Sequence, residues 1–367
     1  MKKKILVIDD SALMRRLVCD MINSDDRFEV GDTASNGEEG LNFLKVNSYD
    51  AVVMDMVMPR MDGLTVLRNL QKMRKHVRIL VFSSETTEGA KITIEALELG
   101  AVDFIHKPSS IMGAKNDEFA KEFLDKLYEV SRAHLLFQAA PAPSATPRNV
   151  PDFQAGMTQP ELMPLTGKSA FRGQSGDKIV AIASSTGGPR ALQSVIPFLP
   201  GNLDAPVLVV QHMPPGFTAS LAERLNAISR LSVEEAAEGM QIRSGHVYIA
   251  PGGKHMNIIP KGGAHVVHLT DGPHREGVKP CANFMYESLA DCGYQNVVCV
   301  VMTGMGADGS EGISYLRPKK KCYVITQEQS TCAVYGMPRS AVTRGLSDEV
   351  EPLENLASAI TKHVGVK

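Results

Sequence analysis

The sequence predicts an α/β protein of two domains, each with a largely parallel sheet, and three observations support this prediction. Apolar runs alternate with amphipathic segments over residues 1–134, and the same alternation returns over residues 177–367. The stretch between them, 135–176, contains recurring prolines and has no apolar periodicity. A chain of 367 residues is also long enough to form two separate cores. Such alternation predicts parallel strands covered by helices.

The first domain contains apolar runs that we interpret as strands. Amphipathic segments such as Leu13–Ile22 and Leu64–Met73 lie between these runs and predict helices on both faces of the sheet. The expected strands are Ile5–Ile8, Phe28–Thr33, Ala51–Met54, Arg78–Phe82 and Asp103–Ile105. The sequence therefore predicts a five-stranded, doubly wound parallel sheet for residues 1–134.

The overall composition argues against several classes of protein. The formal net charge is −2, so the chain is a poor candidate for binding nucleic acid, which depends on neutralising phosphates. No apolar run approaches the length needed to cross a bilayer, and we expect no membrane insertion. The six cysteines form no C-x-x-C pair, and most of them lie in apolar runs. This usage predicts reduced thiols and a cytoplasmic protein, which we expect to be a monomer.

Polar side chains follow the expected strands of the first domain. Asp9 and Asp10 end the first strand, Asp55 ends the third, Ser83 ends the fourth and Lys107 follows the fifth. The carboxyl ends of parallel strands lie on one edge of a sheet, so these side chains should converge there. Clustered carboxylates favour a cation, and Mg²⁺ prefers oxygen ligands. A carboxylate beside Mg²⁺ can attack a phosphoryl group, although each of these residues alone could be a solvated loop carboxylate.

The motifs D-D, M-D-M-V-M-P-R-M-D-G, S-S and K-P together resemble the receiver domain of two-component response regulators. The resemblance covers the whole N-terminal third and implies a flavodoxin-like fold. It implies that Asp55 accepts a phosphoryl group from a histidine kinase. It also implies a Mg²⁺ site formed by Asp10 and Asp55, with Asp9 assisting and the backbone carbonyl of Val57 completing the ligands.

The same resemblance assigns roles to the residues that respond to phosphorylation. Ser83 would donate a hydrogen bond to the phosphoryl group, and Lys107 would form an ion pair with it. One position departs from the receiver pattern, because His106 stands where other receivers often have a switch aromatic residue. A switch that depends on an aromatic rotamer is therefore in doubt.

The second domain begins at Asp177, after a linker that could span on the order of 30 to 40 Å as a coil. Glycine-rich turns flank the apolar run Met256–Ile259, which suggests an antiparallel excursion on a mostly parallel sheet. The expected strands are Ile179–Ala183, Val207–Gln211, His246–Ala250, Met256–Ile259, His265–Leu269, Val297–Met302 and Cys322–Thr326. The expected helices are Pro189–Phe198, Phe217–Ile228, Pro280–Cys292, Asp308–Leu316 and Leu353–Val364.

Three strand ends of the second domain carry unusual polar residues. Ser185 lies in K-I-V-A-I-A-S-S-T-G-G-P, which is typical of a buried strand, a glycine turn and a helix that starts near a proline. His212 follows an apolar run in Q-H-M-P-P-G-F, and Asp308 lies in the turn V-M-T-G-M-G-A-D-G. A serine nucleophile needs a base, and an aspartate can orient a histidine for that task. Backbone N–H groups of a glycine-rich turn can form an oxyanion hole.

Other interpretations of these residues remain open from the pattern alone. His212 could be an ordinary strand-end histidine, and Asp308 could be a helix N-cap. The stretch around Ser185 could be a simple turn or a phosphate loop. The histidines considered as zinc ligands are His212, His246, His255, His265 and His268. A zinc site is less consistent with the sequence, because no two of them have H-x-x-x-H spacing on a helix. The G-x-S-x-G motif of ordinary α/β-hydrolases is absent.

The motifs S-T-G-G-P, Q-H-M-P-P-G-F-T, Y-I-A-P-G-G-x-H-M and T-G-M-G-A-D-G resemble the catalytic domain of the bacterial chemotaxis methylesterase (CheB) family. With the receiver in front, the resemblance covers the whole chain except the linker. It implies hydrolysis of γ-glutamyl methyl esters on the cytoplasmic helices of methyl-accepting chemoreceptors. Deamidation of selected receptor glutamines is implied as well.

The resemblance carries specific roles to this sequence. Ser185 would be the nucleophile, His212 the general base and acid, and Asp308 the orienting carboxylate. The backbone N–H of Met305 would help form the oxyanion hole, with Thr186 lining the site. Ser184 directly precedes the expected nucleophile, and the match to S-T-G-G favours Ser185 over it. No cofactor is expected in this domain.

A phosphoacceptor domain joined by a coil to a hydrolase suggests regulation by obstruction. We expect the unphosphorylated receiver to pack against the hydrolase edge and phosphorylation of Asp55 to reshape the contacting face. Two alternatives belong to other classes: a receiver-controlled esterase of small metabolites, and a non-catalytic regulator that only binds receptors.

Overall fold

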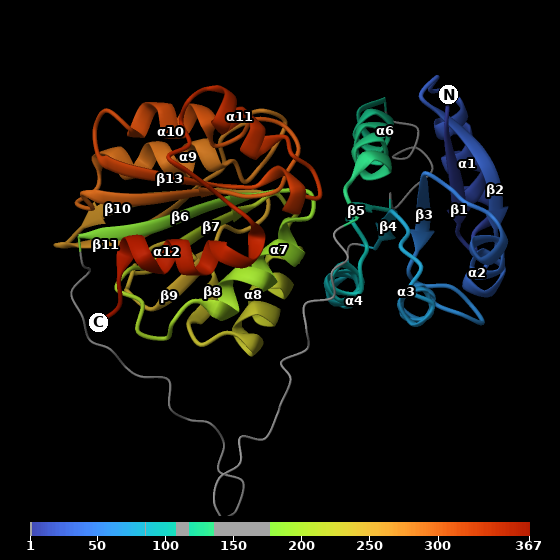
Figure 1. Cartoon of the computed structure of the whole chain (residues 1–367), viewed down its shortest axis with the longest axis horizontal. Coiled ribbons are helices and arrows are strands. Elements are labelled where there is room, and N and C mark those ends of the chain that lie inside the picture. The colour runs from blue at the N-terminus through green and yellow to red at the C-terminus, as the bar shows by residue number, and fades with distance from the viewer. Residues whose placement is uncertain (1, 85, 108–116, 136–176) are drawn as a thin grey trace, which may run out of the picture.

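The computed structural model describes residues 2–84, 86–107, 117–135 and 177–367, which form two α/β domains (Figure 1). Except for Leu135, the predicted linker lies outside the described residues, and so does Pro108 of the K-P motif. No helix in these described ranges is long and apolar enough to cross a membrane.

The N-terminal domain contains the predicted five-stranded sheet, with strand order β2-β1-β3-β4-β5 and all neighbours parallel. The strands are β1 (Lys3–Ile8), β2 (Phe28–Ala34), β3 (Ala51–Asp55), β4 (Ile79–Ser83) and β5 (Asp103–His106). The helices are α1 (Ala12–Asn23), α2 (Gly37–Val46), α3 (Gly63–Lys72), α4 (Thr87–Glu98) and α6 (Asp117–Arg132). The predicted five-stranded, doubly wound parallel sheet is therefore confirmed.

Both faces of the N-terminal sheet are covered, as the unbroken apolar runs predict. Successive strand residues point to opposite faces, so Val7 packs in the cluster with α1 and α6, whereas Ile8 packs in the cluster with α2, α3 and α4. Every residue of β3 and β4 is buried. This burial leaves only the carboxyl ends of the strands free to carry functional side chains.

The C-terminal domain is organised around a seven-stranded sheet with the order β14-β13-β12-β6-β7-β9-β8, in which all neighbouring strands are parallel. The strands are β6 (Lys178–Ser184), β7 (Val207–Gln211), β8 (Ser232–Glu235), β9 (His246–Ile249), β12 (Asn296–Val301), β13 (Lys321–Gln327) and β14 (Glu349–Glu351). A separate antiparallel sheet contains β10 (His255–Lys261) and β11 (Ala264–Thr270). The predicted antiparallel excursion is therefore a hairpin outside the main sheet.

Helices cover both faces of the C-terminal sheet. The cluster with α7, α8 and α12 contains Val180 and Val209, and the opposite cluster contains Ala181 and Leu208 together with α9, α10 and α11. The α-helices are α7 (Gly188–Val195), α8 (Phe217–Ile228), α9 (Ala282–Ser288), α10 (Ser310–Leu316), α11 (Met337–Thr343) and α12 (Leu356–Val364). The short 3₁₀ helices are η1 (Ile196–Phe198), η2 (Leu289–Asp291), η3 (Gln329–Thr331) and η4 (Leu353–Asn355).

Two predicted helix starts need correction. The helix expected from Asp308 begins at Ser310, because Gly309 takes a left-handed φ of 93° and the Asp308 side chain is engaged elsewhere. The helix expected from Pro280 begins at Ala282, because Cys281 is extended. Both corrections lie where α9 and α10 pack against each other, beside the carboxyl ends of the strands.

Gly312 permits the close approach of α10 to α9, and its replacement provides a test of this packing. A Cβ at position 312 would lie 2.7 Å from the backbone oxygen of Asn283, which cannot move aside as a flexible side chain could. We expect Gly312→Ala to lower the free energy of unfolding by about 1–3 kcal/mol despite the better helix propensity of alanine.

Denaturant unfolding of the full chain measures this loss, with Gly201→Ala as the control. A Cβ at the exposed Gly201 would lie 3.6 Å from the nearest atom, so that variant should stay within about 0.5 kcal/mol of the parent. Equal stability of the two variants would contradict the inferred packing constraint.

Candidate active site

The end of β6 places Ser184 and Ser185 in different environments. Ser184 is fully buried as the last strand residue, and its hydroxyl donates to Gln211 Oε1 over 2.7 Å. Ser185 is half-buried in the turn that follows, and its backbone N–H donates to Thr303 O over 3.0 Å. The turn continues through Gly187, whose φ is 78°. Of the two serines, Ser185 is the one whose hydroxyl can reach a substrate.

Strand register brings His212 next to this turn. Ser184 pairs with Gln211 across the β6–β7 interface, so Ser185 and His212 are the next residues on neighbouring strands. The His212 backbone N–H donates to Ser184 O over 3.1 Å. Gln211 also holds the turn, because its Nε2 donates to Ser185 O over 2.9 Å.

Asp308 reaches the imidazole from the loop after β12. Its Oδ2 lies 2.7 Å from His212 Nε2, and its side chain is almost fully buried. An ionised carboxylate only accepts hydrogen bonds, so Nε2 carries the proton and Nδ1 is left as the basic nitrogen. The predicted proximity of His212 and Asp308 is therefore present in the structure.

The Asp308 carboxylate is also held by the start of α9. Its Oδ2 accepts from the N–H of Ala282 over 2.6 Å, and its Oδ1 accepts from the N–H of Asn283 over 3.0 Å. Burial raises the pKa of Asp308, but the hydrogen bond and charge of His212, together with these donors, outweigh burial and hold the pKa below its usual 3.8. The group thus stays a carboxylate inside the protein.

The Ser185 hydroxyl makes no hydrogen bond to another described residue. The structure therefore does not join serine and histidine directly, although their strand positions are adjacent. Catalytic hydrogen bonds are often long before substrate binds. A Cβ at Gly304 would lie 2.7 Å from Ser185 Cβ, so only glycine lets this loop lie against the serine. Met305, the expected oxyanion residue, follows directly and is partly exposed.

The acidic cluster of the N-terminal domain forms at the carboxyl edge of its sheet, as predicted. One carboxylate oxygen each from Asp9, Asp10 and Asp55 lies within 4.8 Å of the others, an arrangement that could hold a metal ion. Lys107 Nζ lies 2.9 Å from Asp9 Oδ2 and 2.6 Å from Asp55 Oδ2. Burial lowers the pKa of Lys107, but its bonds to both carboxylates prevail and raise it. Val57 is exposed beside this cluster, with its N–H 3.4 Å from Asp55 Oδ1.

Ser83 is engaged away from the acidic cluster. Its buried hydroxyl lies 2.6 Å from Thr93 Oγ1 of α4. Because Asp55 pairs with Phe82 in the sheet, Ser83 still follows at the same edge. It therefore connects this edge to α4.

The two domains meet beside Ser185, at the hydrolase edge where the sequence analysis expects the receiver to pack, although the residues that make the contact were not predicted. The Thr186 hydroxyl donates to Asp103 Oδ2 of β5 over 2.6 Å, and both residues are buried. The ring of Phe104 stacks on Phe217 at 4.6 Å between centroids, and His106 approaches the same ring at 4.9 Å. Thr186, which was expected to line the site, has its hydroxyl bonded to the other domain in this structure.

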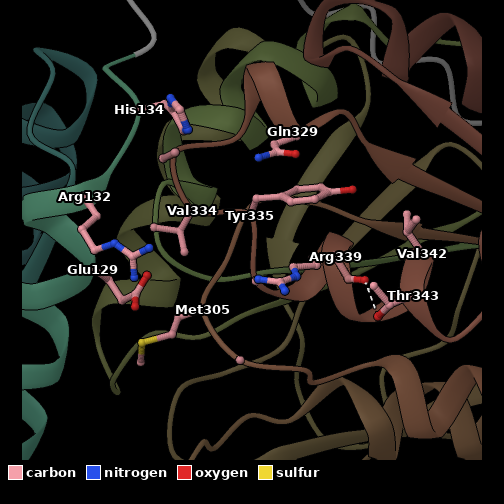
Figure 2. A pocket seen from close by; sticks show the side chains of 13 residues that line it. Glu129, Arg132, His134, Met305, Gln329, Val334, Tyr335, Arg339, Val342 and Thr343 are labelled. Carbon is pink, nitrogen blue, oxygen red and sulfur yellow. Dashed lines mark hydrogen bonds between the residues drawn. The ribbon is translucent and has the colours of Figure 1, made fainter.

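An ion pair adds to the contact between the domains. Arg224 of α8 forms a bidentate ion pair with Glu98 of α4. Its Nε donates to Oε1 over 2.6 Å, and its Nη2 donates to Oε2 over 3.0 Å. A cavity of about 570 Å³ lies at the other side of the interface. Glu129 and Arg132 from the N-terminal domain line it together with Met305 and Tyr335 (Figure 2). The N-terminal domain thus borders the loop that carries Met305.

Comparisons with known proteins identify the family of each domain. Residues 180–360 match the CheB methylesterase family, and residues 5–113 match the response regulator receiver domain. The protein-glutamate methylesterase/protein-glutamine glutaminase 1 of Syntrophomonas wolfei is 40% identical and covers 98% of this chain and 98% of its own length. The chain belongs to the CheB methylesterase family. The corresponding protein of Bacillus subtilis is 39% identical, with 98% of each chain covered. The CheB methylesterase catalytic domain of Thermotoga maritima is 41% identical, covers 50% of this chain and 97% of its own, and has a TM-score of 0.49.

The low pKa of Asp308 predicts a pH-dependent contribution to the stability of this CheB family member. A carboxylate with a depressed pKa stabilises the fold above its usual value of 3.8, and this stabilisation is lost as pH falls through the folded value. Asp308→Asn should lower the free energy of unfolding at neutral pH by about 1–3 kcal/mol. The amide NH₂ group of asparagine would point at backbone N–H donors, so at least one buried hydrogen bond would be lost.

The difference between parent and Asp308→Asn should shrink as the pH is lowered below 3.8. Urea unfolding at a series of pH values measures it, with the exposed Asp291→Asn as the control. A difference that stays constant down to the acid limit of folding would show that Asp308 is not an ionised, stabilised carboxylate.

Proposed function

We propose that this chain is a phosphorylation-activated serine hydrolase that removes methyl groups from glutamate methyl esters of chemoreceptors and deamidates selected receptor glutamines. The relatives at about 40% identity carry the names of both activities. The observation that carries the proposal is the 2.7 Å contact between His212 Nε2 and the buried Asp308 carboxylate, next to the half-buried Ser185. A helix of a chemoreceptor is the proposed substrate.

The first half-reaction uses the free nitrogen of the histidine. His212 Nδ1 takes the proton of the Ser185 hydroxyl as Oγ attacks the ester carbonyl, and a tetrahedral oxyanion forms. Asp308 stabilises the resulting imidazolium through Nε2–H. The imidazolium then gives its proton to the methoxy oxygen, so methanol leaves and the glutamyl group stays on Ser185 as an ester.

The second half-reaction repeats these steps with water. His212 takes a proton from water, the hydroxide attacks the acyl-enzyme, and the proton returns to Ser185 Oγ as the glutamate leaves. A glutamine amide follows the same course with ammonia as the leaving group. The N–H of Met305 stabilises the oxyanion, and one such donor contributes roughly 3–4 kcal/mol in known hydrolases.

The acidic cluster is the proposed phosphorylation site, with Asp55 as the acceptor. The oxygen donors of Asp9, Asp10 and Asp55 fit Mg²⁺, with the Val57 carbonyl as a further ligand. When bound, Mg²⁺ would neutralise charge on the phosphoryl group during its transfer. A chemotaxis histidine kinase is the proposed donor. Lys107, which contacts Asp55 in this structure, would contact the phosphoryl oxygens, and Ser83 would turn from Thr93 towards them.

The domain contact supports obstruction by the unphosphorylated receiver. Thr186 is the neighbour of the proposed nucleophile, and its hydroxyl is held by Asp103 of the receiver. A receptor helix could not lie across Ser185 while β5 and α4 occupy that edge. Asp103, Phe104 and His106 belong to the strand that ends next to Lys107. A movement of Lys107 towards a phosphoryl group would therefore pull on the strand that makes the contact.

We expect Ser185→Ala to abolish methanol release from methylated receptor, because no hydroxyl remains to form the acyl-enzyme. The assay compares the parent and the variant, each with and without a small-molecule phosphodonor and Mg²⁺. Ser184→Ala serves as the matched control and should keep most of the activity, since the Ser184 hydroxyl is turned into the core.

Three results would contradict the proposal in different ways. Methanol release by Ser185→Ala equal to that of the parent would exclude Ser185 as the nucleophile. Hydrolysis of soluble esters with no turnover of methylated receptor would favour the small-metabolite esterase. An inactive parent that still binds receptors would favour the non-catalytic regulator.

Deletion of residues 1–134 should raise the activity above that of the unphosphorylated full chain. We expect an increase of roughly tenfold or more, because a tenfold shift corresponds to only about 1.4 kcal/mol of docking free energy. The measurement is methanol release at equal concentrations of folded protein, checked by circular dichroism. No increase would count against obstruction and leave the hydrolase assignment in place.

A further inference from the structure

Cys281 contacts the proposed catalytic aspartate from the side opposite the histidine. Its Sγ lies 3.0 Å from Asp308 Oδ1, whereas His212 contacts Oδ2 of the same carboxylate. The other donors to Asp308 are backbone N–H groups, from Ala282, Asn283 and Gly309. His212 and Cys281 are therefore the two side chains that hydrogen-bond this carboxylate within the described residues.

The thiol is a donor in this contact. Burial raises the pKa of the Cys281 thiol far above its usual value, and the Asp308 charge raises it further, so sulfur keeps its proton. An ionised carboxylate has no proton to donate, so the S–H must point at Oδ1. S–H groups are weak donors in general, but this acceptor is charged and the pair is excluded from water.

A second buried histidine fixes the position of Cys281. The Cys281 N–H donates to His255 Nδ1 over 3.2 Å, and His255 Nε2 donates to Pro273 O over 2.9 Å. His255 is fully buried, and its ring lies 4.3 Å from that of Phe284. Burial lowers the pKa of His255, which favours the neutral ring that these two bonds require. The backbone of Cys281 is thus held by a buried side chain that the mechanism does not otherwise use.

We infer that Cys281 is a positioning residue, which keeps the Asp308 carboxylate ionised and turned so that Oδ2 faces His212. This inference rests on the proposed function of Ser185, His212 and Asp308. If the thiol is removed, Oδ1 loses a donor that no solvent can replace, because position 281 is fully buried. Besides His212, the carboxylate then keeps only the N–H donors of Ala282, Asn283 and Gly309, so it is held less firmly against the imidazole.

The ionisable groups around Asp308 come from several elements. Besides His212 and Cys281, they are His255 on β10, Glu276 in the loop before α9 and Tyr286 on α9. Glu276 hydrogen-bonds Asn283 Nδ2 over 2.7 Å rather than Asp308 itself. Substitution of Cys281 leaves all of these groups in place, so a change in pH dependence would report on the lost S–H donor.

The experiment compares three variants of the full chain by methanol release from methylated receptor over a range of pH. Cys281→Ala removes the donor, Cys281→Ser keeps a donor, and Cys292→Ala is the control. Cys292 is also buried, but its Sγ donates to Leu289 O over 3.1 Å on the same domain, away from Asp308. Thermal unfolding of each variant shows whether the protein is folded.

We expect kcat of Cys281→Ala to fall by about tenfold with KM unchanged, since a hydrogen bond to a charged group is lost. The acid limb of its kcat/KM profile should move to lower pH, because a carboxylate that is held less firmly against the imidazole stabilises the imidazolium less. Cys281→Ser should move both values back towards those of the parent, and Cys292→Ala should match the parent. Partial unfolding would lower the apparent kcat, but it would leave the pH of the acid limb of the kcat/KM profile unchanged.

The outcomes separate this inference from the proposed function. A parent without methylesterase activity overturns the proposed function. An active parent with a Cys281→Ala variant that keeps the parental kcat and acid limb overturns the role of Cys281 alone. A folded Cys281→Ser variant with the same loss of kcat and the same shift of the acid limb as Cys281→Ala would also overturn the role of Cys281. The retained hydrogen-bond donor would then have no effect.

Discussion

A buried carboxylate cannot stay charged without donors, and this constraint organises the C-terminal domain around Asp308. Moving an unpaired carboxylate out of water costs far more than a single hydrogen bond recovers. The fold meets the requirement by bringing three chain segments to one side chain: the strand end with His212, the start of α9, and Gly309. The close packing of α9 on α10 follows from the same need, and Gly312 makes that packing possible.

One strand of the receiver, β5, connects its acidic cluster to the domain contact beside Ser185. β5 ends beside Lys107, which contacts Asp55, and the same strand supplies the residues that touch Thr186 and Phe217. Phe217 begins α8, and the loop before it begins at His212. Consecutive residues of β5 therefore connect the proposed phosphorylation site to the proposed hydrolase edge. Transmission over such a route needs only a small displacement of rigid backbone.

The sequence predicted those parts of the fold that depend on local patterns. Long apolar runs such as Val207–Gln211 are buried on both faces and became strands with little change in their limits. The strands β8 and β14 were missed because they are short and carry glutamates at the sheet margin. The α11 helix was missed because it is short and has a proline near its start.

The site was predictable where side chains follow buried strands, and unpredictable where its contacts cross the chain. Strand order brings His212 to Asp308, which are 96 positions apart, as expected from parallel topology. The Thr186–Asp103 contact joins two domains, and nothing local to either residue indicates it. Cys281 looked like an ordinary core cysteine, because its contact with Asp308 depends on where α9 begins.

The outermost strands of the large sheet have a consequence for how copies of the protein meet. β14 is three residues long and β8 is four residues long, and β8 exposes Glu234 at the margin. An unsatisfied strand edge is a template for another strand, but a strand of three or four residues offers only a few backbone groups to a second copy. Association of two β8 edges would also bring two copies of Glu234 together, so short margins and an acidic residue protect a sheet that is otherwise almost entirely apolar from growing into aggregates.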